Sequence, residues 1–444
     1  MAKKVLILAK DKTAQDIQEM LLKLPVSLEI AASSKEIKKK AKGASLVILD
    51  DDILRSGNSR LRSEICSHLR RVKIDFILIS SRRNIPSVLE AKDLGAVDYI
   101  TKPIHYRDFI LRFNAALKKK SRIACIGGGT GLFNVLLSLK MLPGVLLTSI
   151  VSMSDDGGSS GRLRASFGIL PPGDIRRSLV ALSNAPAFMN DLMHYRFSKG
   201  WGLKGHNFGN LFLVALSEIR GTMSDAIKGV GDILNIQGIV LPVTTQLTTL
   251  CAEFEDGTVV KGESKIDLSE ERRPELHIKR IWQEPSVACD ADVFAAIINA
   301  DFIIIGPGDL YTSLITNLLV KNVRKAISLS SAKKIYICNL MTEPGETTNY
   351  DATTHVKEII KYLGRDLLNY VIISNTRVSP EAVRKYAFKN QTPVSVGDMQ
   401  DLWETTKASI ILSDVGDVSE LVRHHDAKLR NEIDKIIASS KPVR

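Results

Sequence analysis

RIACIGGGTGLFNVLLSLK, residues 122–140, decides the fold of the larger part of this 444-residue chain. An apolar run at residues 123–126 ends in a cluster of glycines, and apolar residues at helical spacing follow. Glycine supplies positive φ angles and bare backbone, so this pattern is typical of a strand, a tight turn and a helix. The first N–H groups of such a helix favour an anion above the turn. The sequence therefore predicts a phosphate-binding turn made of Gly127, Gly128, Gly129, Thr130 and Gly131.

A second glycine-rich loop, SMSDDGGSSGRLR at residues 152–164, follows the next apolar run, residues 145–151. Loops at the carboxyl ends of adjacent parallel strands share one crevice, so we expect this loop to face the first. Its two aspartates suit either ribose hydroxyls or a divalent cation, with Mg²⁺ as the candidate ion. Its glycines allow close approach of the backbone, and its arginines offer forked donors to phosphate oxygens. The predicted site residues here are Asp155, Asp156, Gly157, Gly158 and Arg162.

Three further segments continue this design. PPGDIRRSLVALS, residues 171–183, carries Asp174 in position to cap a helix, and arginines in the first turn, where the helix dipole disfavours cations unless an anion lies nearby. KGHNFGNLFLVAL precedes another apolar helix, and its His206 is either a ligand contact or a structural hydrogen-bonding group. ADFIIIGPGDLYTS repeats the strand, glycine turn and helix. These segments add Arg176, Asn207, Asn210, Gly306, Gly308 and Thr312 to the candidate site.

The intervening and later segments complete an α/β pattern over residues 122–440. Residues 240–290 alternate with period two around an Asp-Gly turn, which predicts a β-rich insertion. A strand at residues 335–338 ends in NLMTEPGET, where Asn339 and Glu346 are placed to form hydrogen bonds. The fold class is therefore a Rossmann-like, doubly wound domain that follows a separate N-terminal α/β domain.

Residues 1–118 form that N-terminal domain, and residues 119–121 form the linker. Its predicted strands, which alternate with helical patterns, are residues 5–8, 46–49, 76–79 and 97–100. The segments LVILDDD and GAVDYITKPI resemble the receiver domain of two-component response regulators, which has a flavodoxin-like fold. The resemblance implies that Asp50 is at the phosphoacceptor position, with Ser80 and Lys102 beside it.

The receiver-like domain lacks one part of that site. Receivers need a pair of acids after the first strand, because carboxylates hold the cation that lets a phosphoryl group approach an aspartate. Here these positions are Ala9 and Lys10, with Asp11 remaining, and the Lys10 ammonium is a candidate for the place of the cation. We predict a pseudo-receiver that serves docking or dimerisation and is not phosphorylated on Asp50 with Mg²⁺.

Composition limits the classes of function. The net charge is +12, and residues 1–120 alone hold 25 Lys and Arg against 14 Asp and Glu. The basic clusters at residues 38–40 and 118–120 are typical of solvated helix faces or linkers, with an acidic protein partner or a membrane surface as the alternative. The lack of aromatic residues among the basic runs argues against a platform for single-stranded nucleic acid. No apolar run reaches the roughly 18 residues of a membrane span, and no secretory signal is present, so we expect a cytoplasmic protein. Five cysteines without CxxC spacing indicate reduced core thiols.

Seven motifs occur in order along about residues 121–430: GGGTGL, DDGGSSGRLR, PPGDIRRSL, GHNFGNL, GPGDLYTS, YICNLMTEPGET and VRHHD. Together they resemble the bacterial gluconeogenesis factor family, relatives of 2-phospho-L-lactate transferase (CofD-like). The resemblance implies a regulator that binds a nucleotide sugar of the UDP-N-acetylglucosamine type and supports cell shape and cell-wall synthesis during gluconeogenic growth. It also implies nucleotide contacts at Tyr311, Tyr386 and Arg423.

Three hypotheses stay open. The first is a ligand sensor without turnover, since no Ser/His/Asp or Cys/His set and no P-loop lysine are present. The second is a transferase, in which Asp155 or Asp156 holds Mg²⁺ on a diphosphate donor and Arg162 or Arg176 neutralises the leaving phosphate. The third is a dinucleotide dehydrogenase, which leaves the DDGGSSGR loop without a role. We expect a UDP-sugar or other nucleoside-diphosphate ligand, a protein partner at the basic domain, a homo-oligomer, and no certain cofactor.

Overall fold

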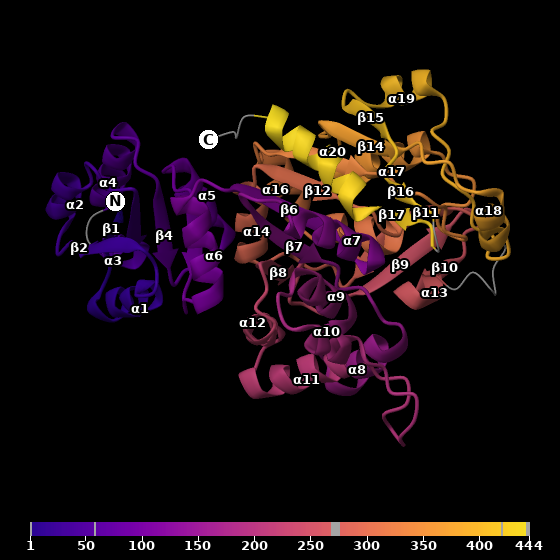
Figure 1. Ribbon diagram of the computed structural model, residues 1–444, viewed down its shortest axis with the longest axis horizontal. Helices are drawn as coiled ribbons and strands as arrows, with labels where there is room; N and C mark the ends of the chain where they lie inside the picture. The colour runs from indigo at the N-terminus through magenta and orange to yellow at the C-terminus, as the bar shows by residue number, and fades with distance from the viewer. Residues whose placement is uncertain (1, 57–58, 268–275, 419–420, 441–444) are drawn as a thin grey trace. The chain divides into compact units, whose positions relative to one another are not determined.

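A computed structural model describes residues 2–56, 59–267, 276–418 and 421–440. The chain forms two compact units, and each is built on a parallel sheet (Figure 1). The smaller unit comprises Met1–Arg122, Gly144–Leu146 and Asp290–Asn299, and the larger unit comprises the rest of the chain. In the described part of the chain, no helix has the length and apolar character needed to cross a membrane.

The smaller unit contains a five-stranded sheet with the strand order β2-β1-β3-β4-β5. All four strand pairs are parallel, and this order is the flavodoxin-like one, which confirms the predicted fold class. Strand β2 (Val26–Ile30) was missing from the sequence prediction, because half-buried and exposed residues mix along this edge strand. The other strands are β1 (Lys3–Leu8), β3 (Leu46–Asp50), β4 (Phe76–Ser80) and β5 (Asp98–Thr101). The helices are α1 (Asp11–Leu21), α2 (Ser34–Lys40), α3 (Asp51–Ser56), α4 (Ser59–Arg71), α5 (Ile85–Asp93) and α6 (Tyr106–Leu117).

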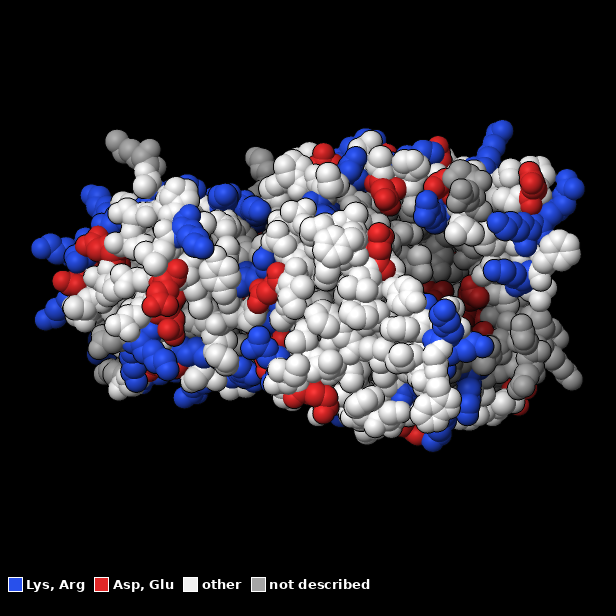
Figure 2. Space-filling view, turned by 60° about the horizontal axis from the view of Figure 1, so that its bottom comes forward, with Lys and Arg blue, Asp and Glu red and all other residues white. Residues whose placement is uncertain are grey.

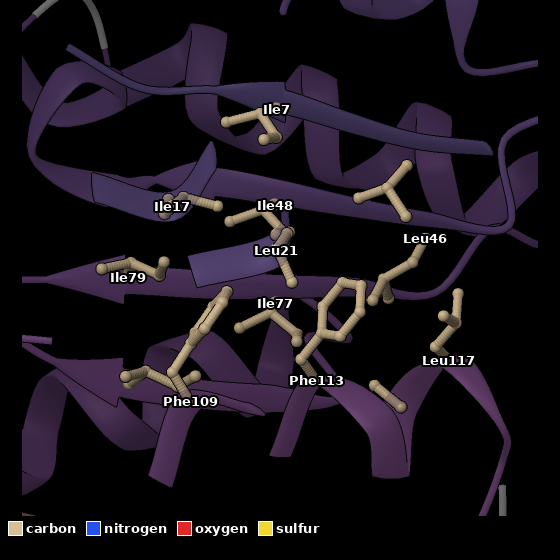
Figure 3. Close-up of a cluster of buried hydrophobic side chains, with 13 residues drawn as sticks. Ile7, Ile17, Leu21, Leu46, Ile48, Ile77, Ile79, Phe109, Phe113 and Leu117 are labelled. Carbon is tan, nitrogen blue, oxygen red and sulfur yellow. The ribbon is translucent and has the colours of Figure 1, made fainter. Parts of the chain in front are cut away.

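The core on one face of this sheet explains why these runs fold together. Alternate residues of a strand point to the same face, so Ile48 and Ile77 meet the apolar sides of α1 and α6 (Figure 3). From α6, Phe109 and Phe113 stack with ring centroids 5.8 Å apart, as expected for residues one helical turn apart. These side chains are buried, so the hydrophobic effect holds both helices against the strands.

The larger unit contains a seven-stranded sheet with the order β15-β14-β13-β12-β6-β7-β8. The chain runs outward from β6 to β7 and β8, and then returns to β12 on the other side of β6. The sheet is therefore doubly wound, as predicted, with its topological switch point between β6 and β12. Its strands are β6 (Ser121–Gly127), β7 (Val145–Val151), β8 (Gly238–Pro242), β12 (Phe302–Ile305), β13 (Lys333–Ile337), β14 (Tyr370–Ser374) and β15 (Ser409–Ser413).

The predicted β-rich insertion is a separate antiparallel sheet with the order β10-β9-β11. It consists of β9 (Thr249–Phe254), β10 (Val259–Lys261) and β11 (Ile278–Glu284), with the short helix α13 (Glu263–Asp267). All five cysteines lie in the described part of the chain, where each is buried and none forms a disulfide, which confirms their interpretation as core thiols.

Helices cover the faces of the larger sheet (Figure 1). Those before the insertion are α7 (Gly129–Lys140), α8 (Gly158–Phe167), α9 (Pro172–Leu182), α10 (Ala187–His194), α11 (Phe208–Arg220) and α12 (Met223–Ile233). Those after it are the π-helix η2 (Leu310–Ile315), α15 (Thr316–Leu319), α16 (Val323–Leu329), α17 (Ala352–Leu363), α18 (Pro380–Ala387), α19 (Met399–Thr405) and α20 (Asp426–Ser439). Helix α14 (Ala291–Ile298) belongs to the smaller unit, where it packs against α5 and β5. A two-stranded ribbon, β16 (Gly416–Asp417) and β17 (Arg423–His424), precedes α20.

Candidate functional site

The two glycine turns that follow β6 and β12 pack directly against each other at the switch point. A Cβ atom at Gly131 would lie 2.3 Å from the carbonyl oxygen of Pro307, so this contact admits only glycine. Gly306 has a φ of +80°, a conformation that side chains rarely adopt. In doubly wound sheets, ligands bind in the crevice outside the strand ends at this point. The fold thus places both predicted turns where such a crevice forms.

The carboxylate of Asp174 lies at the N-terminus of α7. Its Oδ2 accepts a hydrogen bond from the Gly129 N–H at 2.9 Å, and its Oδ1 accepts one from Arg177 at 3.1 Å. The prediction that Asp174 caps its own helix is wrong: α9 has Pro171 at the N-cap and no side-chain cap. The positive end of α7 offers this acid the more favourable position. The sequence predicted that the Gly129 N–H is free to bind a phosphate. In the structure this N–H is already bonded to the Asp174 carboxylate.

The second glycine-rich loop connects this turn with the insertion. Asp155 accepts a hydrogen bond from the Gly157 N–H at 3.0 Å, and its other oxygen lies against Gly173, next to Asp174. Asp156 accepts a hydrogen bond from the Ser264 N–H at 2.8 Å, at the start of α13. The second loop therefore faces the first, and α13 is drawn towards the same crevice.

Eight acids come together around this crevice and form what we call the carboxylate cluster. Burial and the neighbouring carboxylates raise the pKa of Glu263 to about 9 and that of Asp267 to about 6. Burial also raises the pKa of Glu343 to about 7. Figure 2 shows acidic side chains set back in a hollow, with Lys and Arg side chains near its edges. The cluster consists of Asp155, Asp156, Asp174, Glu263, Asp267, Asp309, Glu343 and Glu346.

Sequence reasoning missed most of this cluster. Glu263 and Asp267 belong to the insertion, where no motif marked them, and they reach the crevice only through the fold. Asp309 stood next to the glycines of GPGD, and its position directly after the turn was a usable signal. Among the described residues, no three His, Cys, Asp or Glu side chains are arranged so that they alone hold a metal ion.

Glu346 occupies the start of η2 as Asp174 occupies the start of α7. Its carboxylate accepts hydrogen bonds from the Tyr311 N–H at 3.0 Å and from the Thr312 hydroxyl at 2.6 Å. The Tyr311 side chain is fully buried, and its hydroxyl lies 3.1 Å from that of Tyr350. Two predicted site residues, Tyr311 and Thr312, are thus held by a buried acid whose pKa burial raises well above its usual range.

Three other predicted site residues form a buried polar network beneath the second loop. Arg176 donates to the Asn210 side chain at 3.0 Å and to the Met193 carbonyl at 3.3 Å. Asn207 caps α11 through a 3.1 Å bond from the Asn210 N–H. The Nδ1 atom of His206 lies 3.2 Å from the Ser159 hydroxyl. This contact matches the structural role, which was one of the two interpretations of His206 in the sequence. These contacts orient the helices around the crevice.

Tyr386 and Arg423 come together, although 37 positions separate them in the sequence. The Tyr386 hydroxyl accepts a hydrogen bond from the Val422 N–H at 2.9 Å, and Arg423 lies 3.4 Å from Asp417. Asp417 also lines a cavity of about 730 Å³ at the carboxyl ends of β14 and β15. Sequence reasoning missed its lining, which includes Asn375, Thr376, Arg377, Asp414, Asp417, His425 and Lys428.

In the smaller unit, Lys102 bridges two acids at the carboxyl end of β3. Its ammonium lies 2.9 Å from Asp50 and 3.0 Å from Asp52, and these ion pairs raise its pKa although burial opposes them. Asp52 also accepts hydrogen bonds from the hydroxyl of Ser80 at 2.9 Å and from the N–H of Ser81 at 3.1 Å. The side chain of Asp52 thus occupies the donors around Asp50.

The expectation for Lys10 is wrong. Its side chain is exposed at the N-cap of α1, and it is Lys102 that neutralises Asp50. The side chain of Asp11 lies outside the described part of the chain.

We predict that incubation with acetyl phosphate and Mg²⁺ leaves Asp50 unlabelled. No acid pair at positions 9 and 10 holds the cation, and Asp52 already occupies the surrounding donors. Intact-protein mass spectrometry measures the labelling, with an Asp50→Asn variant as the background. Stoichiometric labelling of the wild-type chain that disappears in this variant contradicts the prediction.

The fold and the site together define the class. A doubly wound sheet whose switch point carries two glycine turns and a carboxylate cluster is a Rossmann-like α/β protein with its ligand crevice at the strand ends. The family model described as 2-phospho-L-lactate transferase CofD matches residues 123–415. The chain belongs to the gluconeogenesis factor family within this CofD group.

Individual relatives agree with this assignment. A gluconeogenesis factor of Bacillus subtilis is 43% identical over 285 residues, which are 64% of this chain and 88% of the relative. One of Halalkalibacterium halodurans is 39% identical over 318 residues, 71% of this chain and 96% of the relative. A crystal structure of a UPF0052 family protein from Bacillus halodurans is 39% identical, with a TM-score of 0.67, and covers 71% of this chain and 99% of its own.

Proposed function

We propose that this protein is a regulatory member of its family that binds a nucleoside-diphosphate sugar of the UDP-N-acetylglucosamine type without turnover. In this role it supports cell shape and cell-wall synthesis during growth on gluconeogenic carbon. The observation that carries the proposal is the position of the two glycine turns, which meet at the switch point of the doubly wound sheet, where such sheets bind nucleotide ligands.

The carboxylate cluster supports a divalent cation that binds together with the diphosphate. Asp174 and Glu346 already occupy the starts of α7 and η2, so a second anion gains most from a cation between it and these acids. Mg²⁺ is typically held by one or two carboxylates together with phosphate oxygens of the substrate. The carboxylate oxygens of the cluster are ligands of the kind that Mg²⁺ prefers. We propose Asp155 and Asp156 as the residues that hold it. Bound there, Mg²⁺ would neutralise diphosphate charge.

The sugar-nucleotide end of the ligand is assigned to Tyr386 and Arg423. Tyr386 is half-buried and offers an aromatic face, and Arg423 offers a forked cation near a cavity of about 730 Å³. A cavity of this size lies within the range typical of small-molecule sites.

A transferase of the 2-phospho-L-lactate type is the second candidate. The observation in its favour is the cluster itself, since Asp174 and Asp309, whose pKa values burial raises, lie near Arg177 and suit proton transfer and charge neutralisation during group transfer. In this alternative the chain would transfer a phosphoryl-containing group from a nucleoside diphosphate donor. The dehydrogenase hypothesis finds no support in the family assignment.

Calorimetry with UDP-N-acetylglucosamine and with GDP, both in the presence of Mg²⁺, tests the proposal. We expect the UDP-sugar to bind at least about tenfold more tightly, equivalent to ~1.4 kcal/mol, and to be recovered unchanged after overnight incubation. A preference for GDP, with GMP or phosphate released, would instead establish the transferase.

The variants Tyr386→Ala and Arg423→Ala should each weaken UDP-sugar binding by about tenfold, because stacking and a charged hydrogen bond are lost. Arg280→Ala is the matched control, since Arg280 is likewise an exposed arginine paired with an acid, Glu253. Unchanged affinity in both test variants would remove these positions from the site.

The remaining expectations belong to this proposal. We place the protein in the cytoplasm, as a homo-oligomer whose basic receiver-like domain docks an acidic protein partner. The charge of residues 1–120, 25 Lys and Arg against 14 Asp and Glu, supports the docking role.

A further inference from the structure

The connection between α10 and α11 is a loop that projects beyond the neighbouring helices (Figure 1). Its two arms are joined by backbone hydrogen bonds from Phe197 N–H to the His206 carbonyl at 2.9 Å and from Gly205 N–H to the Phe197 carbonyl at 2.8 Å. Gly200 and Gly202 have positive φ angles of +102° and +75° and form the tip. The loop therefore holds a defined shape with Trp201 at its end.

The tip of this loop exposes large apolar side chains to solvent. Trp201 is fully exposed, and Leu203 and Tyr195 are about half exposed. On the adjoining helix α10, Phe188 is exposed as well. Single exposed apolar residues are common on a protein surface, but several large ones grouped together mark a contact site for a partner or a membrane. We call these residues, together with Leu192, the Trp201 face.

Cations surround the Trp201 face. Arg196 donates to the Gly205 carbonyl at 2.7 Å, and Arg162 of α8 lies 3.4 Å from the Lys204 carbonyl. The loop itself has three basic residues, Arg196, Lys199 and Lys204, and Arg162 of α8 is a fourth beside it, while residues 192–217 contain no Asp or Glu. An apolar tip within a ring of cations is the pattern of interfacial membrane contacts, in which Trp lies at the headgroup level and Lys and Arg attract anionic lipid.

We propose that the Trp201 face inserts into the surface of an anionic membrane. A second copy of the chain is the less favourable occupant of this face, because the cations of two such loops would repel each other. An anionic surface satisfies both the apolar tip and the cations. This inference does not depend on the ligand proposed for the crevice.

The membrane contact lies close to the second glycine-rich loop. The Asn207 N–H, at the end of the projecting loop, donates to the Ser159 hydroxyl at 3.3 Å, and Ser159 belongs to the first turn of α8. Docking at the Trp201 face would therefore restrain the helix that begins directly after Asp155 and Asp156.

Vesicle sedimentation of the full chain tests the proposal. We expect binding to phosphatidylglycerol/phosphatidylcholine vesicles and none to phosphatidylcholine alone. Trp201→Ala should weaken binding by about tenfold. The double variant Lys199→Ser/Lys204→Ser should weaken it by about thirtyfold, as expected for two juxtamembrane cations. Trp403→Ala, which removes another exposed tryptophan on α19, is the matched control and should bind as the wild type does.

Equal binding of the Trp201 and Trp403 variants, or no binding of the wild-type chain to anionic vesicles, would overturn the proposal. Light scattering distinguishes a membrane from a second copy of the chain as the occupant of the Trp201 face. Self-association that Trp201→Ala abolishes, without vesicle binding, would assign the face to a second copy. Circular dichroism and urea unfolding of the same variants establish that they are folded.

Discussion

Gly131→Ala is expected to lower the free energy of unfolding of the larger unit by about 3 kcal/mol, the upper part of the range for overpacking. The new methyl group would lie 2.3 Å from the Pro307 carbonyl oxygen, and this neighbour is backbone that cannot rotate away. The turns after β6 and β12 must then separate. Because these turns form the proposed diphosphate site, UDP-sugar affinity should fall with stability.

Urea unfolding followed by tryptophan fluorescence measures the effect. The three tryptophans, Trp201, Trp282 and Trp403, all belong to the larger unit, so the signal reports on this unit alone. Gly229→Ala is the matched control, since a Cβ atom there meets open space within helix α12 and should stabilise by about 0.5–1 kcal/mol. Equal midpoints for the two variants would show that the turns are not in contact.

Glu263→Gln is expected to stabilise the larger unit at pH 8 and to change little at pH 5. Burial and the neighbouring acids raise the pKa of Glu263 to about 9 in the folded chain, against an ordinary value of 4.5. The folded state therefore binds a proton that the unfolded state has released, and stability is lost as the pH rises from about 4.5 towards 9. The glutamine side chain does not titrate in this range, so the variant does not lose this stability. At pH 8 its free energy of unfolding should exceed that of the wild type by on the order of 3 kcal/mol.

Thermal unfolding at pH 5, 6.5 and 8 measures this difference. Glu284→Gln is the control, because the pKa of exposed Glu284 is lowered by its hydrogen bond from Lys261. The control should show no gain that grows with pH. If Glu263→Gln and the wild type keep parallel stability curves across this range, the acids of the carboxylate cluster are not electrostatically coupled.

Much of the fold could be predicted because local signals were strong. The buried strands β3, β4, β6 and β12 are short apolar runs bounded by glycine or polar residues, and each was identified. The edge strand β2 was missed because it contains no run of buried apolar residues. Which of its side chains are covered depends on the elements packed beside it.

The site was predicted less completely, for a related reason. Glycine turns are local features, and Gly131 and Gly306 stand where the sequence indicated. The acid that lies above a turn is a long-range choice: Asp174 reaches Gly129 across 45 positions, and Glu346 reaches Tyr311 across 35. No pattern within a single segment contains such a pairing.

The sequence by itself determined the α/β class, the glycine turns, the antiparallel insertion and the loss of the acid pair at Ala9 and Lys10. These features rest on periodicity, backbone freedom and residue chemistry within a few positions. Only the tertiary structure decided that Asp52 occupies the donors around Asp50 and that Glu263 joins the acids of the crevice. Electrostatic interactions depend on distance in space, and only the folded sheet brings strand ends far apart in the chain to one edge.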